Sequence, residues 1–488
     1  MLALCSYAEE YSDDIFNYDL NNETHTAAIV SYKPNTRLSV TVPSEITVYS
    51  TTYKVTSIKN NAFYASTDLW SVILPKTIKS IGNGAFSLCT NLKSITLPEG
   101  LDSIKSNTFS VCANLKEIKL PNTIRYIGNS AFLSCNLTEI KLPDSLRYVG
   151  IAAFSANPID KIYIPKHVES IEPGAFSCNS LSSITIDPEN KTYDSRDNCN
   201  AIVITNTNTL WKGIRTSTIP KTVTALGKLA YDGCYDLKEL TIPSQIERME
   251  VSNLWNLGGL ESIKVDKNNK VFDSRNDCNA AIETKTNTLV RGCKNTIIPN
   301  TIKTIGKWAF YNTKCQKIEL PNSVEVLDTS AFSGCYSEEI ILPKSLKKIS
   351  MDAFSNCSEL TKLTLPNSIT ELAANAFYGT YKLTEITSYI TNPEKFPLNI
   401  TWNEYMNAYN TLYVPYGTKE AYMNTQGWNV FKNIIEMPND ETTNISGIIS
   451  DSAQKSLYNI AGQKVNGNCK GITIVKYSDG STRKVIKK

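Results

Sequence analysis

The chain has 488 residues, of which 41% are apolar and 20% are charged, and its 50 basic side chains nearly balance its 47 acidic ones. This composition is too apolar for a disordered chain and lacks the basic excess of nucleic-acid-binding proteins, so no nucleic-acid partner is expected. No run of 18 apolar residues occurs, and any association with a membrane is therefore predicted to be peripheral.

The first 58 residues predict two different segments. Residues 1–8, MLALCSYA, combine an apolar run with small residues and precede the acidic stretch EEYSDD. That order is typical of the end of a secretory signal peptide, although an ordinary unfolded N-terminus is the alternative. Residues 9–58 alternate apolar and polar side chains, as at Leu38, Val40 and Val42. This alternation predicts an N-terminal β cap over the first turn of a repeat array.

A repeat of 22 or 23 residues runs through residues 59–388. Each copy holds an L-x-x-I-x-L-P stretch, a second apolar pair and an Ala-Phe dipeptide. The repeated phenylalanines are Phe63, Phe86, Phe109, Phe132, Phe154, Phe176, Phe310, Phe332, Phe354 and Phe377. Residues two apart face the same way from a strand, and proline ends the strand. The fold predicted is a β-rich repeat solenoid of roughly 13 stacked coils, with parallel strands and one shared core.

The chain has 13 cysteines, and most of them follow the repeat. Cys89, Cys112 and Cys135, for example, each lie three residues after the repeated phenylalanine. A thiol that recurs once per coil is best explained as a small buried apolar group. One or two disulfides between neighbouring coils are the alternative. No C-x-x-C motif occurs, so no zinc site and no other metal site is predicted.

These motifs together resemble the BspA-like leucine-rich repeat family. The residues that carry the resemblance are the L-x-x-I-x-L-P strand, the turns at 80–82 (SIG) and 126–128 (YIG), and the Ala-Phe dipeptide with its following cysteine. The resemblance covers about residues 55 to 388. It implies a leucine-rich-repeat solenoid and a protein that is secreted by, or held on the outer surface of, a bacterium. It also implies adhesion to a host or microbial surface or extracellular-matrix protein.

Two inserts interrupt the repeat, at residues 187–220 and 266–299. They align without gaps at an offset of 79 residues, which indicates an internal duplication. Each has a polar tip, an apolar stretch and a T-N-T-L turn, and we expect a short β-hairpin that leaves the coil and returns. The tips are rich in Asp and Asn, which could bind calcium. Asx-rich turns are more often simple turns, and the spacing matches no EF-hand loop.

The repeat is lost after residue 388. Residues 389–437 predict a C-terminal cap with a last strand from Leu412 to Val414 and a short helix beginning near Thr418. Residues 438–488 predict a polar linker and a small β module, because Asp479-Gly480 lies between two alternating runs. The module resembles the C-terminal sorting signals of exported surface proteins. A plain β appendage is the alternative.

No catalytic constellation is found, so no enzyme and no cofactor are predicted. The two histidines, His25 and His167, lie far apart in sequence, and the adjacent Glu338 and Glu339 would point to opposite sides of a strand. The working surface predicted instead is the concave strand face of the solenoid. Its candidate binding residues are Trp70, Lys119, Lys141, Tyr163, Lys264, Glu319 and Ile341.

Three interpretations of the strand face remain open at this stage. The first, which we favour, is protein binding in adhesion through that face or the inserts. The second is carbohydrate binding, which would need an exposed aromatic platform. The third is a structural spacer whose strand face is only solvated, with charges paired between neighbouring strands.

Overall fold

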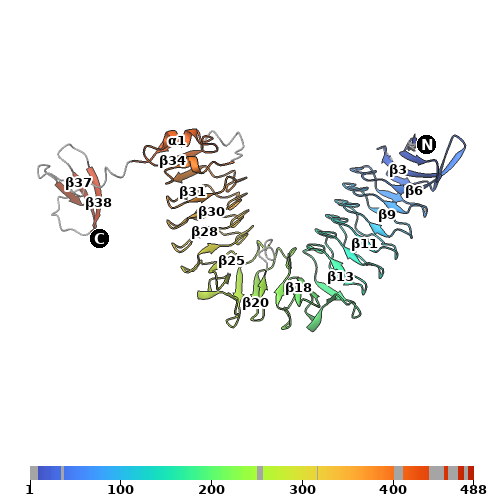
Figure 1. Cartoon of the computed structure of the whole chain (residues 1–488), viewed down its shortest axis with the longest axis horizontal. Coiled ribbons are helices and arrows are strands. Elements are labelled where there is room, and N and C mark those ends of the chain that lie inside the picture. The colour runs from blue at the N-terminus through green and yellow to red at the C-terminus, as the bar shows by residue number, and fades with distance from the viewer. Residues whose placement is uncertain are drawn as a thin grey trace, which may run out of the picture.

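A computed structural model shows a β-solenoid of about 16 turns with little helix. It describes residues 9–34, 38–249, 257–315, 317–399 and 410–438, together with three strands near the C-terminus. Figure 1 shows the solenoid as two arms that meet near β18 and β20, where the inserts lie. The signal-peptide prediction for residues 1–8 lies outside the described residues.

The L-x-x-I-x-L stretches form one side of the solenoid, which we call the strand face. In β13 the apolar residues Ile162 and Ile164 are buried, while Tyr163 between them is 47% exposed. Neighbouring strands pair in parallel, so that this alternation repeats from coil to coil. The strands of this row are β4 (Ser39–Thr41), β7 (Ser71–Ile73), β9 (Ser94–Thr96), β13 (Lys161–Ile164), β15 (Ser183–Ile186), β20 (Glu239–Ile242), β22 (Ser262–Val265), β27 (Lys317–Glu319), β29 (Glu339–Ile341), β31 (Lys362–Leu365), β33 (Glu385–Ser388), β34 (Thr411–Val414) and β35 (Asn433–Glu436).

A second row of two-residue strands forms another side, which we call the short-strand face. Its glycines let neighbouring coils approach closely, since a Cβ on Gly128 would lie 2.5 Å from the backbone nitrogen of Ser106. The strands are β8 (Ser80–Ile81), β10 (Ser103–Ile104), β11 (Tyr126–Ile127), β12 (Tyr148–Val149), β14 (Ser170–Ile171), β19 (Ala225–Leu226), β21 (Arg248–Met249), β26 (Thr304–Ile305), β28 (Val326–Leu327), β30 (Lys348–Ile349) and β32 (Glu371–Leu372).

The repeated phenylalanines stack inside the solenoid, as predicted. Phe86 and Phe109 are fully buried, with ring centroids 5.5 Å apart and an interplanar angle of 8°. The ladder runs from Phe63 to Phe176 and resumes from Phe310 to Phe377. The eleven described cysteines are all buried and free, which confirms the prediction of apolar thiols over the disulfide alternative for these residues.

The inserts are antiparallel hairpins that rejoin the short-strand row. In the first, β16 (Tyr193–Asp194), β17 (Ile202–Ile204) and β18 (Thr209–Lys212) pair in order, and β18 then pairs with β19 in parallel. In the second, β23 (Phe272–Asp273), β24 (Ala280–Glu283) and β25 (Thr288–Gly292) repeat the arrangement. A single 3-10 turn lies between the first two strands of each insert, η1 (Arg196–Asn198) in the first and η3 (Arg275–Asp277) in the second.

Both ends of the array are closed by β structure. At the front, β1 (Glu9–Ser12), β2 (Phe16–Asn21), β3 (Thr26–Tyr32), β5 (Glu45–Val48) and β6 (Thr51–Ile58) form a mixed sheet that joins β8. At the back lie η4 (Pro393–Lys395) and α1 (Lys419–Asn424), with Trp428 fully buried. Beyond them, β36 (Ser456–Asn459), β37 (Gly471–Lys476) and β38 (Thr482–Lys487) pair antiparallel.

Three expectations need correction. The solenoid has about 16 turns rather than 13, because each insert returns as a coil and the row continues past residue 388. The last strand of the row is β35 and not the strand at Leu412–Val414. The row is also not one continuous ladder: its first sheet ends at β9 and its next strand is β13, so residues 117–119 and 139–141 form no strand although they carry the motif.

Candidate functional site

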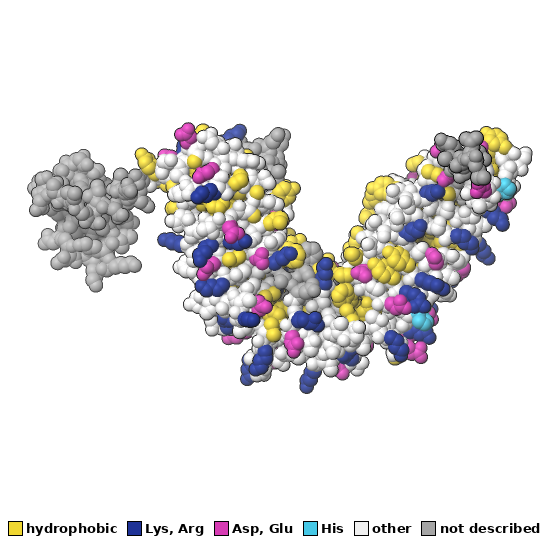
Figure 2. All heavy atoms as spheres, viewed as in Figure 1, with side chains coloured by type: hydrophobic (Ala, Val, Ile, Leu, Met, Phe, Trp, Pro, Cys, Tyr) yellow, Lys and Arg dark blue, Asp and Glu magenta, His cyan; other side chains and the backbone are white. Residues whose placement is uncertain are grey.

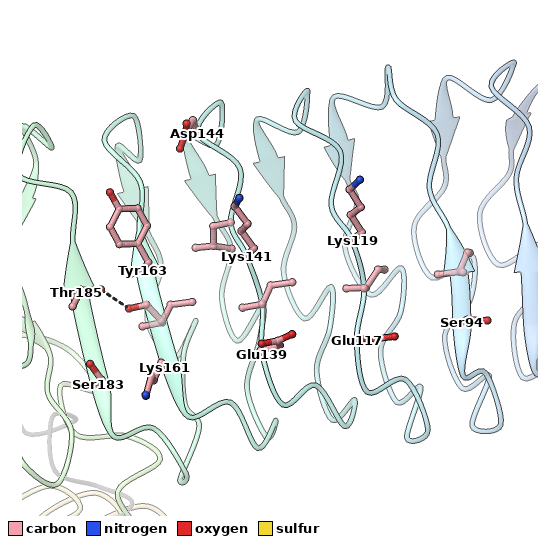
Figure 3. Close-up of a pocket in the computed structure, with 15 residues that line it drawn as sticks. Ser94, Glu117, Lys119, Glu139, Lys141, Asp144, Lys161, Tyr163, Ser183 and Thr185 are labelled. Atoms are coloured by element: carbon pink, nitrogen blue, oxygen red, sulfur yellow. Dashed lines mark hydrogen bonds between the residues drawn. The ribbon is translucent and has the colours of Figure 1, made fainter.

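An open groove of about 930 Å³ lies on the strand face where the ladder is interrupted. Buried or partly buried isoleucines form its floor, namely Ile95, Ile118, Ile140 and Ile162. Figure 3 shows Lys119 and Lys141 along one rim, with Glu117 and Glu139 along the other. The groove therefore has an apolar floor, a rim of lysines and a rim of glutamates, and Lys161 continues the glutamate rim below Tyr163.

The charged side chains along the two rims of this groove are not paired inside the solenoid. Glu117, Lys119, Glu139, Lys141 and Lys161 make no ion pair within 4.0 Å and no side-chain hydrogen bond to any described residue. No backbone hydrogen bond joins residues 117–119 to residues 139–141, and the nearest bond between these two coils runs from the Thr138 nitrogen to the Lys116 oxygen at 3.2 Å. Charged side chains with no internal partner are free to bind an external one.

The strand face of the C-terminal arm differs from the groove. There the charges pair between neighbouring strands, as in Lys317–Glu339 at 3.0 Å and Lys362–Glu385 at 3.1 Å. Near the bend, Lys264 pairs with Glu239 at 3.0 Å. The expectation of a solvated face with cross-strand pairing thus describes these rows, and it does not describe the groove. Over the face drawn in Figure 2, basic and acidic side chains are interspersed on both arms.

Tyr163 lines the groove near one end and connects it to the first insert. Its hydroxyl donates a hydrogen bond of 2.7 Å to Oδ2 of Asp187, the first residue of the insert. Hydrogen bonds from the Glu189 backbone nitrogen and from Tyr163 lower the pKa of Asp187, and the same bond raises the pKa of Tyr163. The phenol ring is thereby held in place beside Lys141, with 47% of the residue exposed.

The structure brings together three of the seven predicted binding residues, Lys119, Lys141 and Tyr163. The other four lie apart from the groove. Trp70 is 42% exposed and lies under the ammonium of Lys93, which is 3.7 Å from the centre of its ring. Glu319 is exposed on β27, and Ile341 on β29 is only partly exposed.

Two positions of the strand face escaped the sequence analysis. Pro220 and Pro299 end the returning coils of the inserts, so Thr218 and Ile297 occupy the outward position two residues before each proline. Ile297 is 74% exposed, and Thr218 lies beside Thr241 and Glu239 in a smaller groove of about 390 Å³. The Ile-Pro dipeptides at 219–220 and 298–299 match the end of the strand motif in the other coils. They were the sequence signal that could have assigned Thr218 and Ile297 to the strand face.

The insert tips are closed by ion pairs. Arg196 binds both carboxylate oxygens of Asp194, and the same pair recurs as Arg275 and Asp273 in the second insert. Within the described ranges, no group of three His, Cys, Asp or Glu side chains is placed to hold a metal ion. In the same ranges, no helix has the length and apolar character that crossing a bilayer requires.

The repeat motifs match a known family model, "BspA type Leucine rich repeat region", over residues 43–156, 102–210, 208–279 and 281–398. No curated protein matches the chain. Among solved structures, a leucine-rich cell surface protein of Faecalibacterium prausnitzii is 22% identical, with a TM-score of 0.40, and covers 90% of this chain and 99% of its own.

Two further solved structures are similar to this chain at the same level. A leucine-rich repeat protein of Bacteroides ovatus is 21% identical, with a TM-score of 0.38, and covers 81% of this chain and 100% of its own. The pneumococcal vaccine antigen PcpA is 19% identical, with a TM-score of 0.36, and covers 88% of this chain and 99% of its own. The match to the family model covers most of the sequence. The chain therefore belongs to the BspA-type leucine-rich repeat family of bacterial surface proteins.

Proposed function

We propose that this chain is a non-enzymatic protein of the bacterial surface or its surroundings that binds an extracellular protein partner in adhesion. The groove on the strand face is the binding site. One observation supports this proposal above the others: Lys119, Lys141, Glu117 and Glu139 line an apolar floor without internal partners, whereas equivalent charges on the C-terminal arm neutralise one another.

The two rims define the chemistry of the partner. A segment that lies along the solenoid axis would meet lysines on one side and glutamates on the other, with apolar side chains over Ile118 and Ile140. Acidic residues on one side of the segment and basic residues on the other would complement this arrangement. Such a segment, exposed on a host or microbial surface or extracellular-matrix protein, is the occupant that we favour over a globular surface.

The C-terminal arm is better suited to a second role, as a spacer. Its strand-face charges pair with one another, as in Lys317–Glu339 at 3.0 Å and Lys362–Glu385 at 3.1 Å, and leave little unpaired charge for a partner. Exposed ion pairs of this kind contribute less than about 1 kcal/mol each to stability. They do, however, remove unpaired charge from the surface. In this proposal the C-terminal arm carries the groove away from the cell.

The test compares charge reversal in the groove with charge exchange outside it. The full chain, the variant Lys119→Glu/Lys141→Glu and the control Lys264→Glu/Glu239→Lys would be passed over a panel of immobilised, purified extracellular-matrix proteins. The control exchanges an ion pair on the same face without changing its net charge. We expect the groove variant to bind at least about tenfold more weakly and the control to bind like the parent chain.

Added salt provides a second readout, because charge-driven association weakens as ions screen the rims. Failure of every matrix protein to bind the parent chain would leave the spacer as the role of the whole molecule. Equal weakening by both variants would place the site outside the groove.

A further inference from the structure

The short-strand face carries two tyrosines that stack on each other between two serines. The ladder places Ser103, Tyr126, Tyr148 and Ser170 side by side on β10, β11, β12 and β14. The two tyrosine rings lie 4.7 Å apart, with an interplanar angle of 3°. The ring planes are therefore nearly parallel, and the stack ends at a serine on either side.

The outer face of the Tyr126 ring is open over Ser103. Neighbouring coils are about 4.8 Å apart, and a serine side chain ends two atoms from its Cα, so it covers only the base of a tyrosine ring beside it. Tyr126 is 39% exposed as a result, whereas Tyr148 is more deeply covered. Neither phenol hydroxyl makes a hydrogen bond to any part of the chain that the structure describes.

Polar groups of both charges border this open ring face. The carboxylate of Asp102 accepts a 2.8 Å hydrogen bond from the Ser103 hydroxyl, which places it at the edge of the Ser103 position. Arg125, directly before Tyr126, is exposed, and its side chain makes no hydrogen bond or ion pair to a described residue. Arg147, by contrast, is ion-paired to Glu169 one coil further on. One carboxylate oxygen and one guanidinium thus remain available beside the ring.

We propose that the outer face of Tyr126, supported by Tyr148, binds a neutral pyranose unit of a glycan. The C–H bonds on one side of a pyranose carry partial positive charge and pack against the electron-rich face of an aromatic ring. The hydroxyl groups around the sugar then find an acceptor in Asp102 and donors in Arg125. The carboxylate of Asp102 beside the ring disfavours acidic sugars, which carry the same charge.

This site is independent of the protein-binding groove. The groove lies on the strand face, whereas Tyr126 and Tyr148 lie on the short-strand face of the same coils. Carbohydrate binding needs an exposed aromatic platform, and Tyr126 offers one on a side of the solenoid other than the strand face. A sugar and a protein segment could occupy the two sides together.

The test is calorimetric titration of the full chain with cello-, xylo- and manno-oligosaccharides and with N-acetyllactosamine. We expect at least one of them to bind, and Tyr126→Ala to weaken that binding by about tenfold, since loss of an aromatic contact costs about 1.4 kcal/mol. Tyr126→Phe should retain the affinity, because the hydroxyl has no partner to lose. Tyr378→Ala, which removes a tyrosine that is 47% exposed on the C-terminal arm, is the matched control.

Circular dichroism of each variant separates loss of the site from loss of the fold. Lys119→Glu/Lys141→Glu should bind the sugar like the parent chain, so that failure of the groove and failure of this site are told apart. The proposal would be overturned if none of the four oligosaccharides gave a heat of binding to the parent chain. It would also be overturned if the parent chain and Tyr126→Ala bound the sugar with equal affinity. Binding of an acidic polysaccharide in place of the neutral ones would also overturn it.

Discussion

The guanidinium of Arg196 donates two hydrogen bonds to the carboxylate of Asp194, from Nε at 2.8 Å and from Nη2 at 2.6 Å. Its third nitrogen, Nη1, donates to Oδ1 of Asn208 in the hairpin turn, also at 2.8 Å. One arginine therefore fastens the 3-10 turn η1 to the turn between β17 and β18. Arg275, Asp273 and Asn287 repeat the arrangement in the second insert.

The first prediction concerns the stability of the inserts in acid. Burial alone would raise the pKa of Asp194, but hydrogen bonds from Arg196 and Thr205 outweigh it and hold the pKa below the ordinary value of 3.8. The pKa of Asp273 is likewise lowered, by hydrogen bonds from Arg275 and Thr284. A carboxyl group whose pKa is lowered by folding contributes stability that is present above its unfolded pKa. That stability is lost as the pH falls through the folded pKa.

We therefore expect Asp194→Asn/Asp273→Asn to lose about 1 kcal/mol of unfolding free energy per insert at neutral pH. Below the ordinary Asp pKa of 3.8 the parent chain should lose stability more steeply than the variant, so that their difference shrinks. Urea unfolding at a series of pH values measures this convergence. If the unfolding free energies of the parent chain and the variant differed by the same amount down to the lowest pH, the proposed role of the carboxylates would be contradicted.

The second prediction concerns a strained turn in the N-terminal arm. Two residues after every repeated phenylalanine except Phe176 the backbone is left-handed, with φ of 62° at Val111 and 56° at Asn356. The C-terminal arm fills this position with Asn or Gly, as at Asn312 and Gly334, whereas the N-terminal arm uses residues such as Leu88 and Val111. A branched side chain in this region costs roughly 1–2 kcal/mol, and asparagine tolerates it better.

Val111→Asn is accordingly expected to raise the unfolding free energy by about 1 kcal/mol. Val111→Thr is the matched control, because threonine is polar but keeps the branch at Cβ. Thermal and urea unfolding of the three proteins would separate the backbone effect from the change in polarity. If the asparagine variant were no more stable than the threonine variant, the left-handed turn would not be a source of strain.

Much of the architecture could be predicted from the sequence, because the solenoid repeats one local rule. The Ile-x-Leu pairs, the proline after them and the phenylalanine ladder each recur, and every copy supports the same structure. The inserts were recognised by their duplication, although their returning coils were not counted. Ile297 was missed for that reason, since the apolar residue expected before it in the strand motif is a threonine, Thr296.

The groove could not be predicted in the same way. Residues 115–120 (LKEIKL) keep the full motif and nearly match residues 237–242 (LKELTI), yet only the second stretch forms a strand. Whether backbones pair depends on small differences in the spacing of coils, which side-chain patterns do not encode. Likewise, Lys264 pairs with Glu239 of the preceding coil, whereas Lys141 makes no pair with Glu117, which holds the corresponding position.

The third prediction concerns the reactivity of the thiols. Burial raises the pKa of Cys89 to about 12 and the pKa of Cys335 to about 11. Because the thiolate is the reactive form, these cysteines should resist iodoacetamide in the native protein at about pH 8. All eleven described cysteines should become labelled in urea, as mass spectrometry of the peptides would show. Rapid labelling of Cys112 in the native chain would show that the coils open at that point.

The last prediction concerns Arg291, a fully buried arginine in the second insert. Its Nη1 donates to the carbonyl oxygens of Trp308 and Tyr311, each at 3.2 Å, but Nε and Nη2 have no hydrogen-bond partner among the residues that the structure describes. Burial without a counter-ion lowers its pKa to about 10. The first insert has Lys212 at the aligned position, and its ammonium donates to the carbonyl oxygen of Asp232.

Lysine at position 291 would keep a donor for the two carbonyl groups and remove the unsatisfied N–H groups of the guanidinium. Each unsatisfied buried group costs about 1–3 kcal/mol, so Arg291→Lys is expected to raise the unfolding free energy by at least about 1 kcal/mol. Arg291→Ala, which leaves both carbonyl oxygens without a donor and opens a cavity, should lower it. Urea unfolding of the three proteins measures both changes. A lysine variant less stable than the parent would show that the guanidinium makes a contribution that lysine cannot replace.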